Sequence, residues 1–205
     1  MKKLFVFLFL FWASLSFAQN ENVPTAANEI CPILIGETIP EGSLQNTDGE
    51  SVDVQKLIKK EKTVLVFYRG SWCPYCNKQL SGLQEIEDQI KELGFQVVAV
   101  SPDLPENLKK SIDKEELKYQ LFSDSKMEYA QQLGLAFKVD DKTRKRYKAF
   151  GIDLEKSSGE THYQLPAPAV FVLNKKGEVQ FSYINPNYKV RLAPEVLLAV
   201  LKASK

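Results

Sequence analysis

The chain has 205 residues, of which 44% are hydrophobic and 26% are charged, and its formal net charge is +1. So balanced a charge gives no electrostatic basis for binding nucleic acid. Three cysteines are too few for a disulfide-stapled scaffold, and a chain of this length and apolar content can bury an ordinary core without such staples. We therefore expect one globular domain.

The first 18 residues have the pattern of a secretory signal peptide. Two lysines precede a nearly unbroken apolar run over residues 4–15, and small residues lead up to the bond after Ala18. The run is shorter than the roughly 20 residues that a spanning helix needs, which disfavours a retained anchor. We expect cleavage after Ala18, export to the periplasm or the outside of the cell, and no stable membrane span afterwards.

Residues 19–32 are polar, and we expect an extended lead-in to a single domain over residues 33–205. The domain opens with a predicted hairpin, because Asp48-Gly49 separates two short strand candidates. Strands and helices then alternate, as apolar runs and apolar spacings of three and four indicate. In chain order we predict a strand over 62–68, a helix from 74 to near Gly94, a strand over 95–100, a helix over 104–112, a strand over 119–122, a helix over 127–133, a hairpin over 169–183 and a helix over 194–202.

This order of elements predicts the fold class. Alternating strands and helices, followed by a hairpin and a last helix, are typical of an α/β layered domain with a mainly parallel central sheet. The sequence contains no internal repeat and no low-complexity segment. One domain accounts for all of it.

Two cysteines stand where the strand at 62–68 meets the following helix, in the segment Trp72-Cys73-Pro74-Tyr75-Cys76. Cysteines separated by two residues can close a tight disulfide, and a helix N-terminus lowers a thiol's pKa. Structural zinc would need four ligands, and Cys31 and His162 are the only other usual soft donors. The pattern therefore indicates redox chemistry at Cys73 and Cys76, the dithiol, without a metal or an organic cofactor.

The dithiol and its place in the order of elements resemble the thioredoxin-fold superfamily, and within it the peroxiredoxin-like AhpC/TSA branch. The segment 35–40, the Asp48-Gly49 hairpin, the segment 165–169 and the turn at 174–177 are similar to that family's landmarks, over roughly residues 33–203. The resemblance implies a thioredoxin-like fold with helices on both faces and an N-terminal hairpin extension. It also implies reduction of hydroperoxides, with re-reduction by a thioredoxin-like donor.

The match departs from the family at two positions. Peroxiredoxins have Thr-x-x-Cys where this chain has Cys73-Pro74-Tyr75-Cys76, so the resemblance places Cys76 at the peroxide-attacking position and Cys73 at the threonine. Arg69 stands where the family has proline. The residues alone allow either cysteine to attack: Cys73, next to Pro74 at the start of the helix, suits disulfide exchange, whereas Cys76 would attack a peroxide.

Four further residues are candidates for binding substrate. Arg69 would stabilise a thiolate or orient a peroxide, or else be a surface charge at the strand end. Trp72 and Tyr75 flank the dithiol, with plain packing favoured for Trp72 and a surface position for Tyr75. The resemblance implies that Pro168 is cis and faces the dithiol, although most X–Pro bonds are trans.

The sequence leaves the roles of several other residues undecided. Cys31 could resolve a sulfenic acid at Cys76, pair between chains or remain free. The charged run 142–148 lies in an insertion over 138–165 and is most simply a solvated helical face, with docking to an acidic partner or a membrane surface as the alternative. The resemblance implies a later arginine that holds peroxide, for which Arg144, Arg146 and Arg191 are candidates. His162 is expected in an exposed loop.

Three functions of different classes follow. The first is a thiol peroxidase that acts through Cys76 and Cys73. The second is an exported thiol–disulfide oxidoreductase that acts on protein disulfides, with Cys73 as the nucleophile. The third is a non-catalytic binding domain with a permanent disulfide. Either redox cycle needs electrons from an outside donor, because an oxidising compartment does not regenerate a dithiol.

Overall fold

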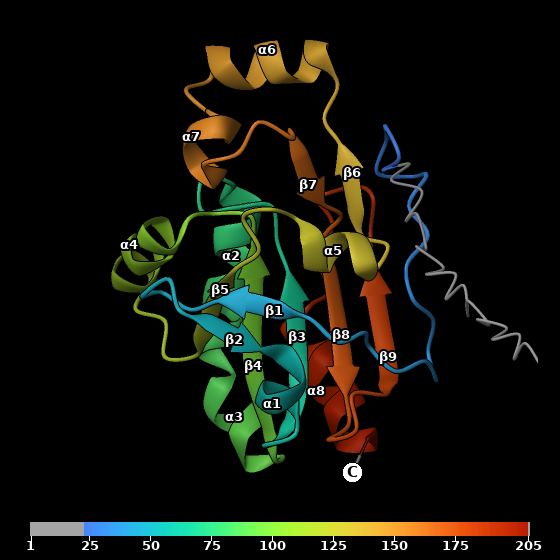
Figure 1. Ribbon diagram of the computed structural model, residues 1–205. Helices are drawn as coiled ribbons and strands as arrows, with labels where there is room; N and C mark the ends of the chain where they lie inside the picture. The colour runs from blue at the N-terminus through green and yellow to red at the C-terminus, as the bar shows by residue number, and fades with distance from the viewer. Residues whose placement is uncertain (1–22, 205) are drawn as a thin grey trace, which may run out of the picture.

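The computed structural model describes residues 23–204, so the predicted signal peptide and the first part of the lead-in lie outside the described residues (Figure 1). From residue 23 the lead-in runs without helix or strand to the domain. Within 23–204, no helix is long and apolar enough to cross a membrane. The seven strands of the main sheet, in chain order, are β1 Ser43–Gln45, β2 Ser51–Asp53, β3 Lys62–Phe67, β4 Phe95–Ser101, β5 Gln120–Ser123, β8 Ala169–Leu173 and β9 Val179–Ile184.

The main sheet is mixed, with spatial order β2-β1-β5-β4-β3-β8-β9. Only the central strands β3, β4 and β5 are parallel to one another, and the pairs on either side of them are antiparallel. The expectation of a mainly parallel sheet is therefore correct for the centre and wrong for the edges. The reason is that both edges are built from hairpins, β1–β2 and β8–β9, whose strands must run in opposite directions.

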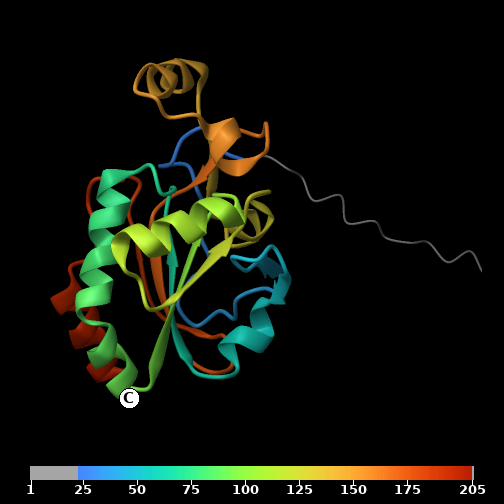
Figure 2. The same ribbon diagram turned by 90° about the vertical axis from the view of Figure 1, so that its left-hand side faces the viewer.

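Alternation along β3 places apolar side chains in two cores. Val64 and Val66 join the core under the helices α2 Pro74–Glu85, α3 Glu87–Glu92, α4 Pro105–Glu115 and α8 Pro194–Ala203. Leu65 and Phe67 join the opposite core with α1 Val54–Ile58, α5 Glu128–Gln132 and the first hairpin. Figure 2 shows these two layers, with α2, α3 and α8 on one side of the sheet and α1 and the first hairpin on the other. The predicted α/β layers with helices on both faces are confirmed.

Two regions differ from the expected elements. The helix predicted from 74 to Gly94 breaks at Ile86, whose backbone ends α2 and begins α3. The apolar spacing continues through the break, which is why periodicity did not reveal it. The insertion over 138–165 has the expected solvated helix at the charged run and, in addition, a second helix and a small sheet that the sequence does not predict. It contains α6 Asp141–Ala149 and α7 Leu154–Ser158, and its two ends belong to a two-stranded sheet of β6 Ala136–Lys138 and β7 Gln164–Pro166.

Candidate active site

The dithiol lies where β3 ends and α2 begins. Cys73 is the N-cap of α2 with an extended backbone, and Pro74 occupies the first turn, where its missing N–H leaves no bond unmade. The Cys73 carbonyl accepts hydrogen bonds from the backbone N–H groups of Cys76 (3.0 Å) and Asn77 (3.1 Å). Both cysteines therefore belong to one helical turn. Both are free thiols, and their exposed fractions are only 1% and 0%.

The two thiols have very different acidities. The pKa of Cys73 is lowered to about 6, mainly because the Cys76 thiol donates a hydrogen bond to the Cys73 sulfur. Burial opposes this change, and the nearby Arg69 guanidinium lowers the pKa further. Burial and the same hydrogen bond raise the pKa of Cys76, while Arg191 acts in the opposite direction. Near neutral pH the pair therefore carries one negative charge, which resides on Cys73 in this arrangement.

Arg69 lies against Cys73. Its side chain is 3% exposed, and its Nη1 is 3.9 Å from the Cys73 sulfur. Three aromatic rings enclose the guanidinium: Trp72 at 4.8 Å, Tyr147 at 5.5 Å and Tyr188 at 3.9 Å from ring centroid to Cζ. Its Nη2 also donates a hydrogen bond to the Tyr147 hydroxyl. Arg69 is thus a buried cation beside a thiolate and not a surface charge.

A second arginine contacts the other cysteine. Arg191 lies in the segment between β9 and α8, and its Nη2 is 3.2 Å from the Cys76 sulfur. Its Nε and Nη1 are buried and have no hydrogen-bond partner within residues 23–204. Buried N–H groups of a guanidinium are rarely left unpaired, because the loss of hydration is costly. The guanidinium that contacts Cys76 therefore carries two further buried donors that are not used within the described residues.

A buried carboxylate holds the turn that precedes the dithiol. Asp103 follows β4 and accepts hydrogen bonds from the Ser71 backbone N–H (2.7 Å), the Ser101 hydroxyl (3.1 Å) and the Ser157 hydroxyl. Gly70 stands in this turn with φ +140°. A Cβ at Gly70 would lie 2.5 Å from the Trp72 indole nitrogen and 3.0 Å from an Asp103 oxygen. The turn can therefore approach both side chains only because Gly70 has none.

The remaining sequence candidates differ in their relation to the dithiol. Trp72 is half-buried and packs between the α2-side core and the small cluster of the insertion, so it combines packing with its contact to Arg69. Tyr75 is 39% exposed, as expected, and lies edge-on to Tyr188 with 5.8 Å between centroids. Tyr188 in turn packs on the Arg69 guanidinium, so Tyr75 lies next to the group that contacts Cys73.

Pro168 is buried at the start of β8, and the neighbouring Ala169 pairs with Phe67 at the end of β3. The expectation that Pro168 is cis is wrong, because its peptide bond is trans. The chain runs from β7 into β8 with Ala167 N–H bonded to the Leu135 carbonyl and the Pro168 carbonyl bonded to the Asn185 N–H. That continuous run suits the trans form, which is the preferred one.

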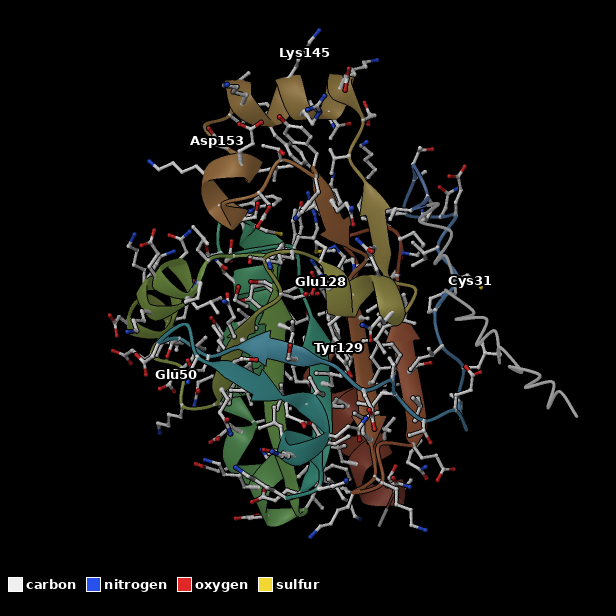
Figure 3. All side chains as sticks on the ribbon, viewed as in Figure 1. Cys31, Glu50, Glu128, Tyr129, Lys145 and Asp153 are labelled. Carbon is white, nitrogen blue, oxygen red and sulfur yellow. The ribbon has the colours of Figure 1, made fainter. Side chains whose placement is uncertain are left out.

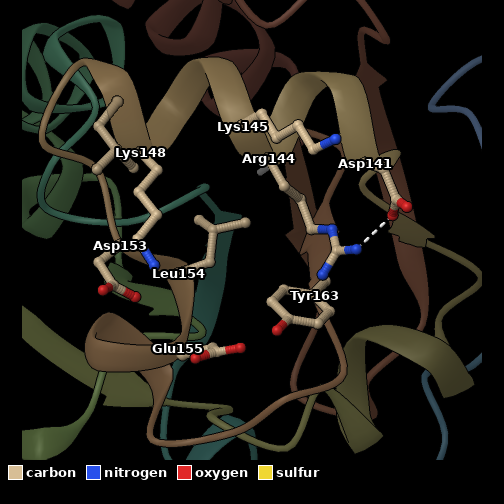
Figure 4. A pocket seen from close by; sticks show the side chains of 9 residues that line it. Asp141, Arg144, Lys145, Lys148, Asp153, Leu154, Glu155 and Tyr163 are labelled. Atoms are coloured by element: carbon tan, nitrogen blue, oxygen red, sulfur yellow. Dashed lines mark hydrogen bonds and ion pairs between the residues drawn. The ribbon is translucent and has the colours of Figure 1, made fainter.

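The other candidate arginines lie away from the dithiol. Arg144 pairs with Asp141 and stacks on the Tyr163 ring at 3.7 Å, beside a hollow of about 240 Å³ between α6 and α7 (Figure 4). Arg146 is exposed on α6. Figure 3 shows that Lys145 also points outward from this helix. Of the three arginines considered, Arg191 is the one that contacts a cysteine.

Cys31 and His162 also lie apart from the dithiol. Cys31 is an exposed free thiol on the N-terminal segment (Figure 3). Its backbone passes close to Gly134, just after α5, on the opposite face of the sheet from α2. His162 is half-buried, with its ring bonded to the Ser125 carbonyl and the Gln164 N–H. Within residues 23–204, no three His, Cys, Asp or Glu side chains gather as a metal site.

Sequence reasoning missed three residues of the site. Asp103 is not among the sequence candidates, yet it accepts a hydrogen bond from the Ser71 backbone N–H and so supports the turn before the dithiol. Asp103 follows β4, the parallel strand next to β3, and residues at the carboxyl ends of such strands often belong to a site. That position could have identified it from the sequence. Tyr147 and Tyr188 carry no such signal, since they reach Arg69 only through tertiary folding.

Comparisons with known proteins agree with this geometry. The model of the AhpC/TSA family matches residues 35–182. The chain is 32% identical over 104 residues to peroxiredoxin Bcp of Escherichia coli (strain K12), a match that covers 51% of this chain and 66% of that protein. Chloroplastic peroxiredoxin Q of Populus jackii is 27% identical over 150 residues, which cover 73% of this chain and 60% of the relative. The matches thus span just under two thirds of these relatives' lengths.

Solved structures show the same fold. Reduced Prx3 from Vibrio vulnificus, in complex with hydrogen peroxide, superposes with a TM-score of 0.68 and 19% identity over 82% of this chain and 99% of that chain. Peroxidoxin BcpB from Mycobacterium tuberculosis superposes with a TM-score of 0.65 and 19% identity, over 83% of this chain and 97% of that chain. The predicted thioredoxin-like, peroxiredoxin-type fold is confirmed.

Proposed function

Because the chain belongs to the AhpC/TSA family, we propose that it is a thiol peroxidase that reduces hydroperoxides at Cys76, with Cys73 as the resolving cysteine. The observation that carries this proposal is the placement of Arg191. One of its nitrogens is 3.2 Å from the Cys76 sulfur, and two more buried N–H-bearing nitrogens have no partner in the part of the chain that the structure describes. A peroxide oxygen beside Cys76 could accept those hydrogen bonds, which strengthen as the O–O bond breaks and charge develops.

The dithiol itself can supply and accept the protons that the reaction with peroxide requires. In the singly charged pair, the proton of Cys76 moves along the existing hydrogen bond to Cys73, which leaves a Cys76 thiolate beside Arg191. This thiolate attacks one peroxide oxygen and the O–O bond breaks. The leaving oxygen takes the proton from Cys73 and departs as an alcohol, or as water from hydrogen peroxide. Cys76 is then a sulfenic acid and Cys73 is again a thiolate.

The second step closes the cycle. The Cys73 thiolate attacks the sulfenic sulfur, and hydroxide leaves and is protonated to water. One helical turn separates the two cysteines, so α2 need not unwind for the disulfide to form. The sum is dithiol plus hydroperoxide giving disulfide, alcohol and water. An outside dithiol then returns two electrons and two protons by exchange, for which we propose a thioredoxin-like donor.

Burial favours a small oxidant over a protein disulfide. The two cysteines are 1% exposed or less, and three aromatic rings enclose Arg69, whose guanidinium contacts the Cys73 sulfur. A hydroperoxide needs only the space of a few atoms to reach Cys76. A protein disulfide would need these rings to move before it could contact Cys73.

The test is rapid mixing of the reduced domain, residues 19–205, with one equivalent of hydrogen peroxide, followed by intact mass and tryptophan fluorescence. We expect loss of two hydrogens per molecule, many times faster than oxidation of a free thiol of similar pKa. Oxidation no faster than that of a free thiol would reject the peroxidase.

The second candidate function is disulfide exchange led by Cys73. Its specific support is the lowered pKa of Cys73, about 6, at the start of α2, because a thiolate there is ready to attack a disulfide. Mixing with an oxidised protein substrate distinguishes the two functions. A mixed disulfide trapped on Cys73 in Cys76→Ser, together with slow peroxide oxidation, would replace the first function by the second.

The site of action is also a proposal. The pattern of residues 1–18 supports export to the periplasm or the outside of the cell. N-terminal sequencing of the protein recovered from the exported fraction should begin at Gln19. Recovery of the uncleaved chain in the cytoplasm would reject this location.

A further inference from the structure

Arg69 is a buried cation without a carboxylate partner. None of the ion pairs formed within residues 23–204 includes it. A buried guanidinium is costly unless an anion and hydrogen bonds compensate for its lost hydration. The anion next to it is the Cys73 thiolate, 3.9 Å from Nη1. The position of Arg69 and the charge of Cys73 therefore depend on each other.

The insertion supplies a polar contact that fixes the other end of this guanidinium. Arg69 Nη2 donates a hydrogen bond to the Tyr147 hydroxyl, and the Tyr147 ring also packs on Trp72 with 5.6 Å between centroids. Burial raises the pKa of Tyr147, so its hydroxyl stays neutral and accepts the bond. With Nη2 held there, Nη1 points to the sulfur.

Tyr147 is the point at which α6 reaches the dithiol. Figure 1 shows α6 beyond the ends of the strands, apart from both helical layers. No residue of α6 is fully buried, and Tyr147 joins α6 to a small cluster with Val139, Leu154 and Leu165. A helix so little packed adds few contacts to the core. Its contact with Arg69 is therefore the feature that relates it to the chemistry.

We propose that Tyr147 is a positioning residue, which holds Arg69 against the Cys73 sulfur and thereby keeps the negative charge of the dithiol on Cys73. The inference rests on the proposed function only in taking the dithiol as the reactive group. It assigns a role to the insertion over 138–165. The ionisable groups that act on Cys73 are Cys76 on α2, Arg69 before α2, Arg191 before α8 and Tyr147 on α6.

The test is a titration of the reduced protein, in which ultraviolet absorbance reports the thiolate. Tyr147→Phe keeps the ring on Trp72 and removes only the oxygen that accepts from Arg69. We expect the first thiolate midpoint, about 6 in the parent, to rise by roughly half a pH unit, as the loss of one hydrogen bond implies. In an Arg69→Gln background, the same change should have no further effect.

The matched control is Tyr163→Phe, which removes the hydroxyl of the tyrosine that stacks on Arg144 of α6 and should leave the midpoint unchanged. Urea unfolding of each variant separates a shift in acidity from a loss of stability. The proposal is overturned if Tyr147→Phe leaves the midpoint in place, or if it shifts the midpoint equally with and without Arg69. Slow peroxide oxidation of a parent that titrates as expected would reject the peroxidase and leave this inference intact.

Discussion

The two halves of the dithiol site are built differently. On the Cys73 side, Arg69 is enclosed by Trp72, Tyr147 and Tyr188 and already bonded to a hydroxyl. On the Cys76 side, Arg191 contacts the sulfur, and two of its buried nitrogens have no partner among residues 23–204. The Arg69 guanidinium already contacts a sulfur and a hydroxyl of the protein, whereas unpaired donors on Arg191 can receive a substrate. Under the proposed peroxidase function, the Cys73 half would set the acidity of the dithiol and the Cys76 half would bind the oxidant.

The largest effects on the rate are expected when each sulfur is removed in turn. Cys76→Ser should reduce the rate of hydroperoxide consumption by roughly three orders of magnitude or more, since the nucleophile itself is lost. Cys73→Ser should keep a single fast oxidation and lose the turnover that requires a disulfide. Stopped-flow kinetics with a thioredoxin-like donor measure both. Equal losses of the first oxidation in the two variants would contradict separate roles.

Arg191→Gln should give the next largest effect. Removing the charged donors beside Cys76 should slow peroxide oxidation by about a hundredfold, as removal of one transition-state donor does elsewhere. Arg191→Lys should recover only part of the rate, because an ammonium lacks the planar fork of donors. Arg146→Gln on the exposed face of α6 is the matched control, with an unchanged rate expected. A rate loss shared by both glutamine variants would point to general charge and not to binding.

Arg69→Gln should change the pH profile more than the maximal rate. Cys73 has its pKa lowered to about 6, so the reactive singly charged pair is present above that pH and is lost as the pH falls through it. Without Arg69 the midpoint should rise by about one pH unit, the scale of one charge-assisted hydrogen bond. The rate would then fall severalfold near pH 6 and little at alkaline pH. A uniform loss at all pH values would place Arg69 with the oxidant instead.

The smallest effect on chemistry, and a clear one on stability, is expected for Gly70→Ala. The new Cβ would press on Trp72 and Asp103, so the free energy of unfolding should fall by about 2–3 kcal/mol. Gly36→Ala is the control, since Gly36 also has a positive φ but no atom within 4 Å of an added Cβ, and should lose only about 1 kcal/mol. Urea denaturation measures both. Equal losses would show that backbone strain alone, without the packing of Trp72, limits this turn.

The Cys73 half also shows how far sequence reasoning reaches. The dithiol, the helix after Pro74 and the hairpins depend on neighbours in the chain, and the structure has them where the sequence predicts them. The side chains that contact the sulfurs, in contrast, come from distant parts of the chain. Arg191 is 115 residues from Cys76, and Tyr147 is 78 residues from Arg69. Only packing of the finished fold brings them together, so the sequence left Arg191 among three arginines and gave no sign of Tyr147.

The same limit explains the errors. The break at Ile86 keeps the apolar spacing, so no local pattern marks it. The trans bond before Pro168 fits the hydrogen-bond partners of Ala167 and Pro168 in neighbouring segments, which a family resemblance does not determine. Local rules located the reactive sulfurs, and tertiary contacts decide how each of them is used.

The most direct test of separate roles is to locate the first oxygen. Reduced Cys73→Ser and Cys76→Ser proteins would each be mixed with one equivalent of hydrogen peroxide and a sulfenic-acid trap, and the adducts mapped by peptide mass spectrometry. We expect rapid trapping on Cys76 in Cys73→Ser, and only slow oxidation of Cys73 in Cys76→Ser. Fast trapping on Cys73, with Cys76 unreactive, would contradict this expectation and make the low-pKa thiol beside Arg69 the attacking group.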